Sequence, residues 1–198
     1  IEAPDHAGVL ESAEVIRSEA RRLARLIDDL LLLDRIDATE LTISRAPIDL
    51  NAVVADTVDR LRALDAGRGI CLTLAQHLPP VPADPERIAQ VVTNLVGNAV
   101  RFSPDGEPVA VRTERLPDAV EIRVIDRGIG IPEDDLESIF HLYQRSQSGL
   151  ARGVSGTGLG LSIVREIVAL HGGVVWAESR EGVGSTFCVR LPLTVPGG

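Results

Sequence analysis

Apolar residues recur along the first part of the chain at alternating spacings of four and three residues. The positions are Val9, Ala13, Ile16, Ala20, Leu23, Ile27 and Leu30. Such a heptad repeat, with Arg, Asp and Glu on the other faces, predicts one long helix over residues 7–36. Its apolar seam needs a partner, which is either a second copy of the chain or a second helix outside this sequence. Packing of the seam on the globular part of the molecule is the alternative.

Beyond residue 38 the pattern breaks into shorter helical and strand-like segments, which predict a separate globular domain. Helices are expected at about 50–66, 84–102 and 159–171, and strands at about 70–75, 108–115, 119–125, 174–178 and 185–191. An edge strand is expected within 37–45, and the proline-rich stretch 79–82 predicts a turn. Because hairpins are mixed with helices, we predict an α+β sandwich with a mixed, mainly antiparallel sheet and helices on one face.

Three parts of the chain follow from this pattern. They are a long helix at 1–38, a globular domain at 39–193 and a short tail at 194–198. The chain has 198 residues, lacks Met and starts at Ile1, so we expect it to be a piece of a longer protein. It has no apolar run of 18 residues, and no signal peptide is visible.

Charge and cysteine content narrow the class of function. The net charge is −9 and no basic tract occurs, which argues against a protein that binds the phosphate backbone of nucleic acids. Cys71 and Cys188 sit in apolar, strand-like runs and suit reduced core thiols better than a disulfide framework.

A glycine-rich loop, Gly156-Thr157-Gly158-Leu159-Gly160-Leu161, precedes the last predicted helix. Backbone N–H groups of such a loop, together with a helix N-terminus, form a ready site for phosphate. The chain has no lysine, which excludes a P-loop, and the loop does not follow a strand, which argues against a dinucleotide fingerprint. Taken alone, the same pattern also occurs in linkers and tight turns.

The predicted helix at 84–102 carries two stripes. Ile88, Val92, Leu95 and Ala99 form an apolar stripe, and Asn94, Asn98, Arg101 and Phe102 lie on a neighbouring one. Asn is a modest helix former, so two of them one turn apart call for an explanation. One is that their carbonyl oxygens face a hard cation such as Mg²⁺ while Arg101 reaches a phosphate. The other is that both Asn side chains simply face solvent.

Two further segments have glycines beside polar residues. Asp126 ends a strand and is followed by Gly128 and Gly130, so its carboxylate could accept a hydrogen bond from an amino group such as adenine N6. In the segment 182–187, Thr186 could form a hydrogen bond near the base. A plain Asp-x-Gly turn and an ordinary turn before a strand are the respective alternatives.

Taken together and in this order, these motifs resemble the catalytic ATP-binding domain of sensor histidine kinases, of the GHKL (Bergerat-fold) ATPase superfamily. The matching segments are 94–104, 126–132, 139–145, 156–164 and 182–187, and the resemblance covers about 41–192. It implies a Bergerat-fold two-layer sandwich that binds ATP and Mg²⁺ and transfers the γ-phosphoryl group to a histidine.

The resemblance also implies a role for individual residues. Asn98 is the implied Mg²⁺ ligand, Asn94 lies beside the phosphates, and Arg145 approaches the γ-phosphate; these three form the implied catalytic set. Asp126 reads adenine N6. The full implied ATP-binding set is Asn94, Asn98, Arg101, Phe102, Asp126, Gly128, Gly130, Ile131, Tyr143, Arg145, Gly156, Thr157, Gly158, Leu159, Gly160, Leu161 and Thr186.

Phe140 and Tyr143 fall in the family's F-box, and residues of about 133–155 match its mobile ATP lid. His141 and Leu142 depart from the residues often found there. Arg101 stands where the family often has Lys, and brings its charge as a planar fork instead of a point.

The amino-terminal helix resembles the second helix of the dimerisation and phosphoacceptor domain, and no phosphoacceptor histidine box is present. Only His6, near the start of the heptad run, offers a weak alternative acceptor among the four histidines, which are His6, His77, His141 and His171. The implied partners are therefore a phosphoacceptor histidine domain, a response regulator and, through residues 7–36, a second copy of the chain. The implied location is a cytoplasmic domain of a membrane sensor. An anti-sigma-type serine kinase, half of a split kinase and an ATP-sensing scaffold are the alternatives.

Overall fold

The computed structural model describes residues 43–64, 69–104, 106–142 and 158–194, together with seven residues of the amino-terminal helix. The chain divides into two compact units, residues 1–41 and 42–198. In the first unit the described residues are Ala13, Ile16, Arg17, Ala20, Leu23, Ala24 and Ile27, and all are helical. The seam side chains of Ile16, Leu23 and Ile27 are exposed. The predicted helix is confirmed at these positions.

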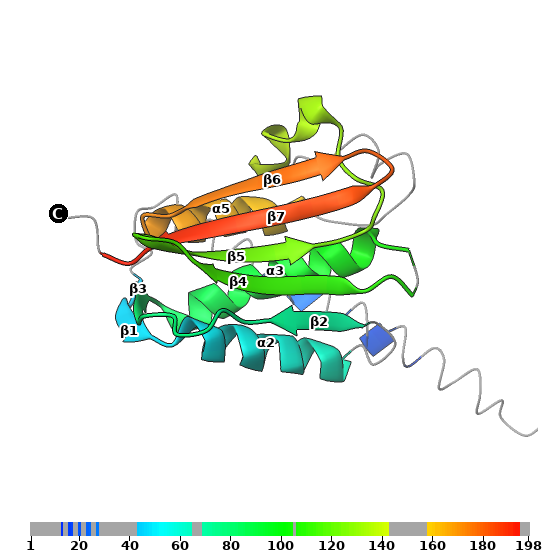
Figure 1. Ribbon diagram of the computed structural model, residues 1–198. Coiled ribbons are helices and arrows are strands. Elements are labelled where there is room, and N and C mark those ends of the chain that lie inside the picture. The colour runs from blue at the N-terminus through cyan, green and yellow to red at the C-terminus, as the bar shows by residue number, and fades with distance from the viewer. Residues whose placement is uncertain are drawn as a thin grey trace, which may run out of the picture. The chain divides into compact units, whose positions relative to one another are not determined.

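The second unit is built on a five-stranded mixed sheet (Figure 1). In spatial order the strands are β2 (Ile70–Thr73), β4 (Val109–Arg115), β5 (Ala119–Ile125), β7 (Gly184–Pro192) and β6 (Val174–Arg180). β2 runs parallel to β4, and the other three pairings are antiparallel. A separate two-stranded sheet joins β1 (Ala46–Ile48) to β3 (Val81–Ala83). The predicted mixed, mainly antiparallel sheet is confirmed.

Among the described residues of this unit, three α-helices accompany the sheets. They are α2 (Leu50–Leu64), α3 (Pro85–Phe102) and α5 (Gly160–Leu170), and two short 3₁₀ turns, η1 (Glu133–Asp135) and η2 (Ser138–Phe140), precede α5. Figure 1 shows α3 and α5 on one face of the sheet. The apolar stripe predicted on α3 is fully buried, and so are Ile122 and Val124 of β5, which face it across the layer interface. This burial holds the two layers together, because apolar surface removed from water stabilises the fold by roughly 25 cal/mol per Å².

Asp84 sets the start of α3, as its position before Pro85 predicts. Its Oδ1 accepts hydrogen bonds from the backbone N–H groups of Glu86 and Arg87, at 3.1 and 3.3 Å. At the same place His171, just after α5, accepts a hydrogen bond at Nε2 from the Asp84 N–H, and its Nδ1–H donates to the carbonyl of Ile167. The end of α5 is thereby fixed to the start of α3. Burial lowers the pKa of His171 and keeps its ring neutral.

Two local predictions were wrong, and a third is contradicted only at residues 43–45. The proline-rich stretch 79–82 is not only a turn, since β3 begins at Val81 and pairs with β1, where Pro47 faces Pro82. Proline is tolerated there because each strand of a two-stranded sheet is an edge. Residues 43–45 hold no strand, and the rest of the expected edge strand lies outside the described residues. Cys71 is exposed, because it lies on edge strand β2 and points to the sheet face opposite α3 and α5, whereas Cys188 is buried.

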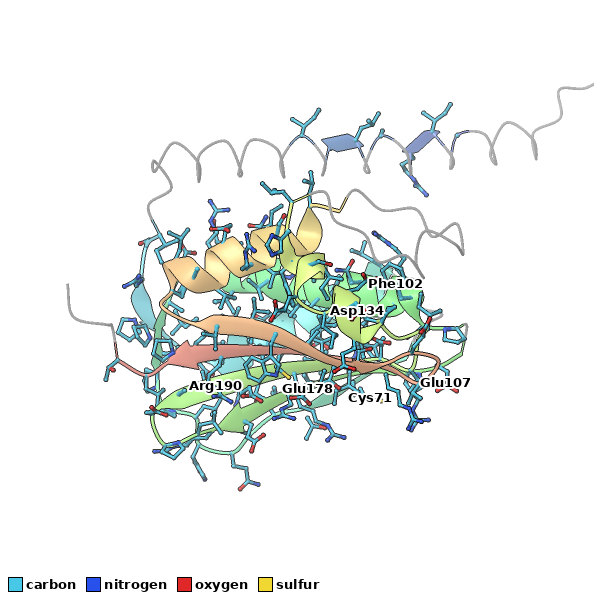
Figure 2. The ribbon with its side chains drawn as sticks, turned by 90° about the horizontal axis from the view of Figure 1, so that it is seen from above. Cys71, Phe102, Glu107, Asp134, Glu178 and Arg190 are labelled. Atoms are coloured by element: carbon cyan, nitrogen blue, oxygen red, sulfur yellow. The ribbon has the colours of Figure 1, made fainter. Side chains whose placement is uncertain are left out.

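The sheet face opposite α3 and α5, on which no described helix of this unit packs and which is called the helix-free face below, carries a buried carboxylate. Glu121 of β5 is 1% exposed, yet its side chain pairs with two guanidinium groups. Arg123 Nε lies 2.6 Å from Oε1, and Arg190 donates to Oε2 from Nε and Nη2. Arg190 also stacks on the ring of Trp176, 5.0 Å from its centroid. Figure 2 shows Arg190, Glu178 and Cys71 on the side of the sheet away from α5.

Candidate functional site

The two Asn side chains of α3 lie half-buried, one helical turn apart, on the stripe beside the buried one. The Nδ2 group of Asn94 donates to the carbonyl of Gly160, at 3.2 Å. This bond ties the middle of α3 to the first residue of α5. A Cβ built on Gly160 would come within 3.7 Å of Cγ of Asn94, so α5 starts in close contact with this side chain. Asn98 carries its amide oxygen one turn further towards the end of α3.

The first turn of α5 starts without a side-chain cap. Gly158 has a φ of +73°, a left-handed conformation that glycine adopts without strain. Leu159 is the N-cap, and an apolar side chain cannot accept a hydrogen bond from the helix start. A helix N-terminus left without a side-chain cap favours an anion. Of the predicted phosphate loop, Gly156 and Thr157 lie outside the described residues, while Gly158, Leu159, Gly160 and Leu161 form this entry into the helix.

Asp126 lies at the end of β5, 5% exposed, with its carboxylate on the helix-covered side. Oδ1 accepts hydrogen bonds from the backbone N–H of Gly128, at 2.8 Å, and from that of Ser185, at 3.2 Å. Burial raises the pKa of Asp126, and these two N–H groups oppose the shift. Within the described part of the chain no guanidinium group pairs with this carboxylate. A buried acceptor with only neutral partners is well suited to bind a ligand's amino group.

The glycines after Asp126 are required by the protein's own packing. A Cβ at Gly128 would come 2.4 Å from the carbonyl oxygen of Phe102, and one at Gly130 would come 2.2 Å from that of Arg180. Gly130 also has a φ of +69°. The loop is thus clamped between the end of α3 and the β6–β7 turn, where Gly182 N–H donates to the Ile129 carbonyl at 2.7 Å. These close approaches to Phe102 and Arg180 account for both glycines without a ligand.

The predicted F-box is only partly described. Phe140, in η2, packs edge-to-face on Phe187 of β7, with ring centroids 6.5 Å apart. Leu142 is exposed, and His141 ends the 3₁₀ turn. Tyr143 and Arg145 lie outside the described residues, as does most of the expected lid. Their predicted contacts with ATP therefore stay predictions.

Most of the described candidate residues lie in three places: on the second half of α3, in the loop that follows β5, and at the start of α5. Phe102 is half-buried at the end of α3, and its carbonyl accepts a hydrogen bond from Ile129 N–H. Ile131 is buried, and Arg101 is exposed in the last turn of α3. Figure 2 shows Phe102 and Asp134 on the α5 side of the sheet.

Thr186 does not lie on the same face of the sheet as Asp126. Its register partners are Ile125 in β5 and Glu178 in β6. Because side chains alternate along a strand, Thr186 shares the helix-free face with Cys188, whereas Ser185 shares the face of Asp126. The predicted contact of Thr186 with the base stays a prediction. Ser185, and its partner Ser179 in β6, were not singled out from the sequence, since a lone Ser in a strand carries no local signal.

Together these groups present a carboxylate acceptor, amide oxygens and an uncapped helix start. Within the described ranges no cluster of three His, Cys, Asp or Glu side chains could hold a metal ion by itself. An amide oxygen of Asn98 could supply only one ligand, so a cation here would take its others from water or from a bound phosphate. The arrangement fits a nucleotide with its metal better than a metal alone.

Comparisons with known proteins agree with this geometry. A model of the family described as "Histidine kinase-, DNA gyrase B-, and HSP90-like ATPase" matches residues 83–195. The sensor-like histidine kinase SenX3 of Mycolicibacterium smegmatis is 34% identical over 191 residues, which cover 96% of this chain and 50% of SenX3. The chain therefore spans half the length of this relative.

Two solved structures are also similar. Full-length ShkA in complex with AMPPNP superposes with a TM-score of 0.78 at 27% identity, over 100% of this chain and 41% of ShkA. The histidine kinase ThkA, in complex with the response regulator TrrA, gives a TM-score of 0.72 at 25% identity, over 98% of this chain and 53% of ThkA. Since the family model covers more than half of the sequence, the chain belongs to the histidine kinase-, DNA gyrase B- and HSP90-like ATPase family.

Proposed function

We propose that this chain is the ATP-binding catalytic part of a two-component sensor histidine kinase. It transfers the γ-phosphoryl group of ATP to a histidine outside the chain. The observation that carries the proposal is Asp126, a buried carboxylate held by two backbone N–H groups at the end of β5. Its environment suits the 6-amino group of adenine, and the residues around it lie in the order that the family pattern requires.

The remaining groups suit the phosphates and a magnesium ion. The triphosphate lies towards the N-terminus of α5, whose N–H groups and dipole favour negative charge. Asn98 supplies an amide oxygen to Mg²⁺, with phosphate oxygens and water as the other ligands. Asn94 holds the start of α5 in place through Gly160. When bound, the ion neutralises charge on the phosphates, and catalysis of phosphoryl transfer depends mainly on positioning and charge.

Arg101 and Arg145 complete the proposed phosphate contacts. Arg101 lies in the last turn of α3, the helix that carries both Asn side chains. We assign Arg145 to the γ-phosphate, and Tyr143, Gly156 and Thr157 to the nucleotide, from the family pattern. Thr186 belongs to the same predicted set, although its strand position favours the opposite face.

The partners follow from the missing acceptor. We propose a phosphoacceptor histidine domain, which the amino-terminal helix would complete, a homodimer formed through residues 7–36, and a response regulator. The solved complex of ThkA with TrrA supports the last of these. We also propose that the chain is the cytoplasmic part of a membrane sensor. Among the described residues no helix is long and apolar enough to cross a bilayer.

A serine kinase of the anti-sigma type, which shares the ATP fold, is a weaker candidate. Such a kinase normally lacks a coiled-coil helix in front, whereas Ile16, Leu23 and Ile27 here lie exposed on a helix. A half of a split kinase or an ATP-sensing scaffold differs only in where the acceptor lies. The identity of the phosphorylated residue separates these possibilities.

Incubation with γ-labelled ATP and Mg²⁺ tests the proposal. The chain alone should acquire no stable label, because it has no histidine box. A second chain that carries such a box should acquire a label that acid removes and alkali does not, as expected for phosphohistidine. Acid-labile label on the isolated chain would refute the assignment of a donor without an acceptor. Acid-stable label on a serine would favour the serine kinase.

A further inference from the structure

Three polar side chains form a row across the end of the sheet, one from each of three neighbouring strands. Asp126 directly follows β5, Ser185 lies in β7 and Ser179 lies in β6. Ser179 and Ser185 are register partners, and the backbones of Ser185 and Asp126 exchange hydrogen bonds of 3.2 and 2.8 Å. By strand alternation all three share the inner face with the buried Val124 and Phe187.

The hydroxyl group of Ser179 uses its whole hydrogen-bonding capacity on groups of the protein in and beside this row. Its oxygen accepts from Ile131 N–H at 2.8 Å, and its proton goes to the carbonyl of Gly184, also at 2.8 Å. Ser185 Oγ lies 3.0 Å away. Because a hydroxyl has one proton and two acceptor positions, Ser185 is the donor of this third bond. One side chain thus joins the end of the Asp126 loop to both residues that start β7.

These bonds reach Asp126 by two routes. Ile131 closes the loop that starts at Asp126, and Ser185 supplies an N–H to the Asp126 carboxylate. The apolar positions of β6 that precede Ser179 on the same face are Val175 and Ala177, so packing alone would accept an alanine at 179. The hydroxyl appears only at the end of the strand where Asp126 lies.

We propose that Ser179 is a positioning residue for adenine recognition, which acts through Asp126 and touches no part of the nucleotide. It holds the loop and the β7 start in the arrangement that aims the carboxylate at the 6-amino group. The inference rests on the proposed ATP-binding function and deepens it. It assigns selectivity for the base to a residue outside the predicted site.

The test compares ATP with inosine triphosphate, which carries an oxygen in place of the 6-amino group. Calorimetry with Mg²⁺ should show that the wild-type chain binds ATP about 10- to 100-fold more tightly, since a hydrogen bond to a charged acceptor is lost. In Ser179→Ala this preference should fall by about 10-fold, through weaker ATP binding, while the affinity for inosine triphosphate changes by less than about 2-fold. Ser179→Thr keeps a hydroxyl in a strand and should restore the preference.

The matched control removes a hydroxyl group that lies away from Asp126 and that also accepts one hydrogen bond from a backbone N–H and donates one. Thr113 Oγ1, on β4, accepts from Ala75 N–H at 2.9 Å and donates to Asn51 Oδ1 at 2.8 Å. Thr113→Val should lower the melting temperature and leave the ratio of the two affinities unchanged. If Ser179→Ala does not fold, Ser179→Cys takes its place, because a thiol has nearly the same shape and is a weak hydrogen-bonding group. It should also reduce the preference for ATP.

The outcomes separate the inference from the function beneath it. If a folded Ser179→Ala or Ser179→Cys keeps the wild-type preference for ATP, the positioning role is wrong and the proposed function stands. The same holds if the variant lowers the affinity for both nucleotides equally. If the wild-type chain binds ATP without preferring it to inosine triphosphate, base recognition through Asp126 fails, and the role of Ser179 fails with it. If the wild-type chain binds neither nucleotide, the proposed function is overturned.

Discussion

Asp126 and Glu121 are two buried carboxylates five residues apart in the chain, and their hydrogen-bonding partners differ in charge. Glu121, 1% exposed, is compensated by two guanidinium groups on the helix-free face. Asp126, 5% exposed, has only neutral backbone partners on the helix-covered face. A buried charge normally requires an opposite charge nearby. We infer that the compensated carboxylate serves the fold and propose that the uncompensated one binds a ligand.

The same contrast extends to the surroundings of each group. Around Glu121 the contacts link neighbouring strands, from Arg123 in β5 to Arg190 and Trp176 in β7 and β6. Around Asp126 they fix the carboxylate against a loop that two glycines allow to pass close to α3 and to the β6–β7 turn. Burial alone therefore does not distinguish a carboxylate that binds a ligand from one that stabilises the fold. The charge of its hydrogen-bonding partners is the more informative property.

The largest stability effect is expected at the compensated carboxylate. Glu121→Gln keeps the shape and removes the charge between Arg123 and Arg190, so we expect unfolding in urea to become easier by about 1–2 kcal/mol, with affinity for Mg·ATP unchanged. The partial exposure of both arginines limits the loss. Glu178→Gln, at an exposed position of β6, is the control and should cost less than about 0.5 kcal/mol. A loss of ATP affinity in Glu121→Gln would break the comparison.

A second variant, Asn98→Ala, tests the proposed nucleotide site instead of the fold. Asn98→Ala removes the proposed amide ligand of Mg²⁺ from a half-buried position, so affinity for Mg·ATP should fall about 10-fold, or about 1.4 kcal/mol, with little change in stability. Titrations with and without Mg²⁺ measure the effect, which should vanish when the ion is withheld. An equal loss in both conditions would mean that Asn98 acts on the nucleotide or the fold instead of on the ion. Thr93→Ala, on the exposed side of α3, is the matched control.

His171 provides a smaller test, because it is a buried group with neutral hydrogen-bond partners like Asp126. Its pKa is lowered in the folded chain, so the unfolded chain binds a proton more readily. Stability is therefore complete above the ordinary histidine pKa of about 6.5 and is lost as pH falls below it, towards the lowered value. In His171→Gln this part of the pH dependence should disappear from urea unfolding between about pH 5 and 7. An unchanged slope would show that His171 is not protonated on unfolding in that range.

The least perturbing test uses the two thiols, one on an edge strand and one in the centre of the sheet. Cys71 is exposed and Cys188 is buried. Burial raises the pKa of Cys188 to about 11, which keeps it protonated and unreactive at neutral pH. A thiol reagent should label Cys71 within minutes and Cys188 only on unfolding. Rapid labelling of Cys188 in the native chain, followed by mass spectrometry, would contradict the packing of the helix-free face.

Local signals predicted much of this molecule. The apolar stripe of α3 and the start of this helix near residue 84 depend on residues close in sequence, and both are confirmed. The strand β3 was missed because its partner β1 lies more than thirty residues earlier, and no local pattern reveals that pairing. The face to which Thr186 points could not be predicted, because a one-residue difference in register moves a side chain to the other face, and the inner face is known only once the sheet is assembled.

The central claim is that Asp126 is the base-reading group of an ATP site, and calorimetry of Mg·ATP binding to wild-type chain and Asp126→Ala tests it most directly. The account predicts that wild type binds and that the variant, still folded by circular dichroism, loses at least about 100-fold in affinity, because a charged hydrogen-bond acceptor is removed from a buried position. Glu121→Gln, measured alongside, should bind as wild type does. Equal affinity of Asp126→Ala and wild type for Mg·ATP would contradict the claim.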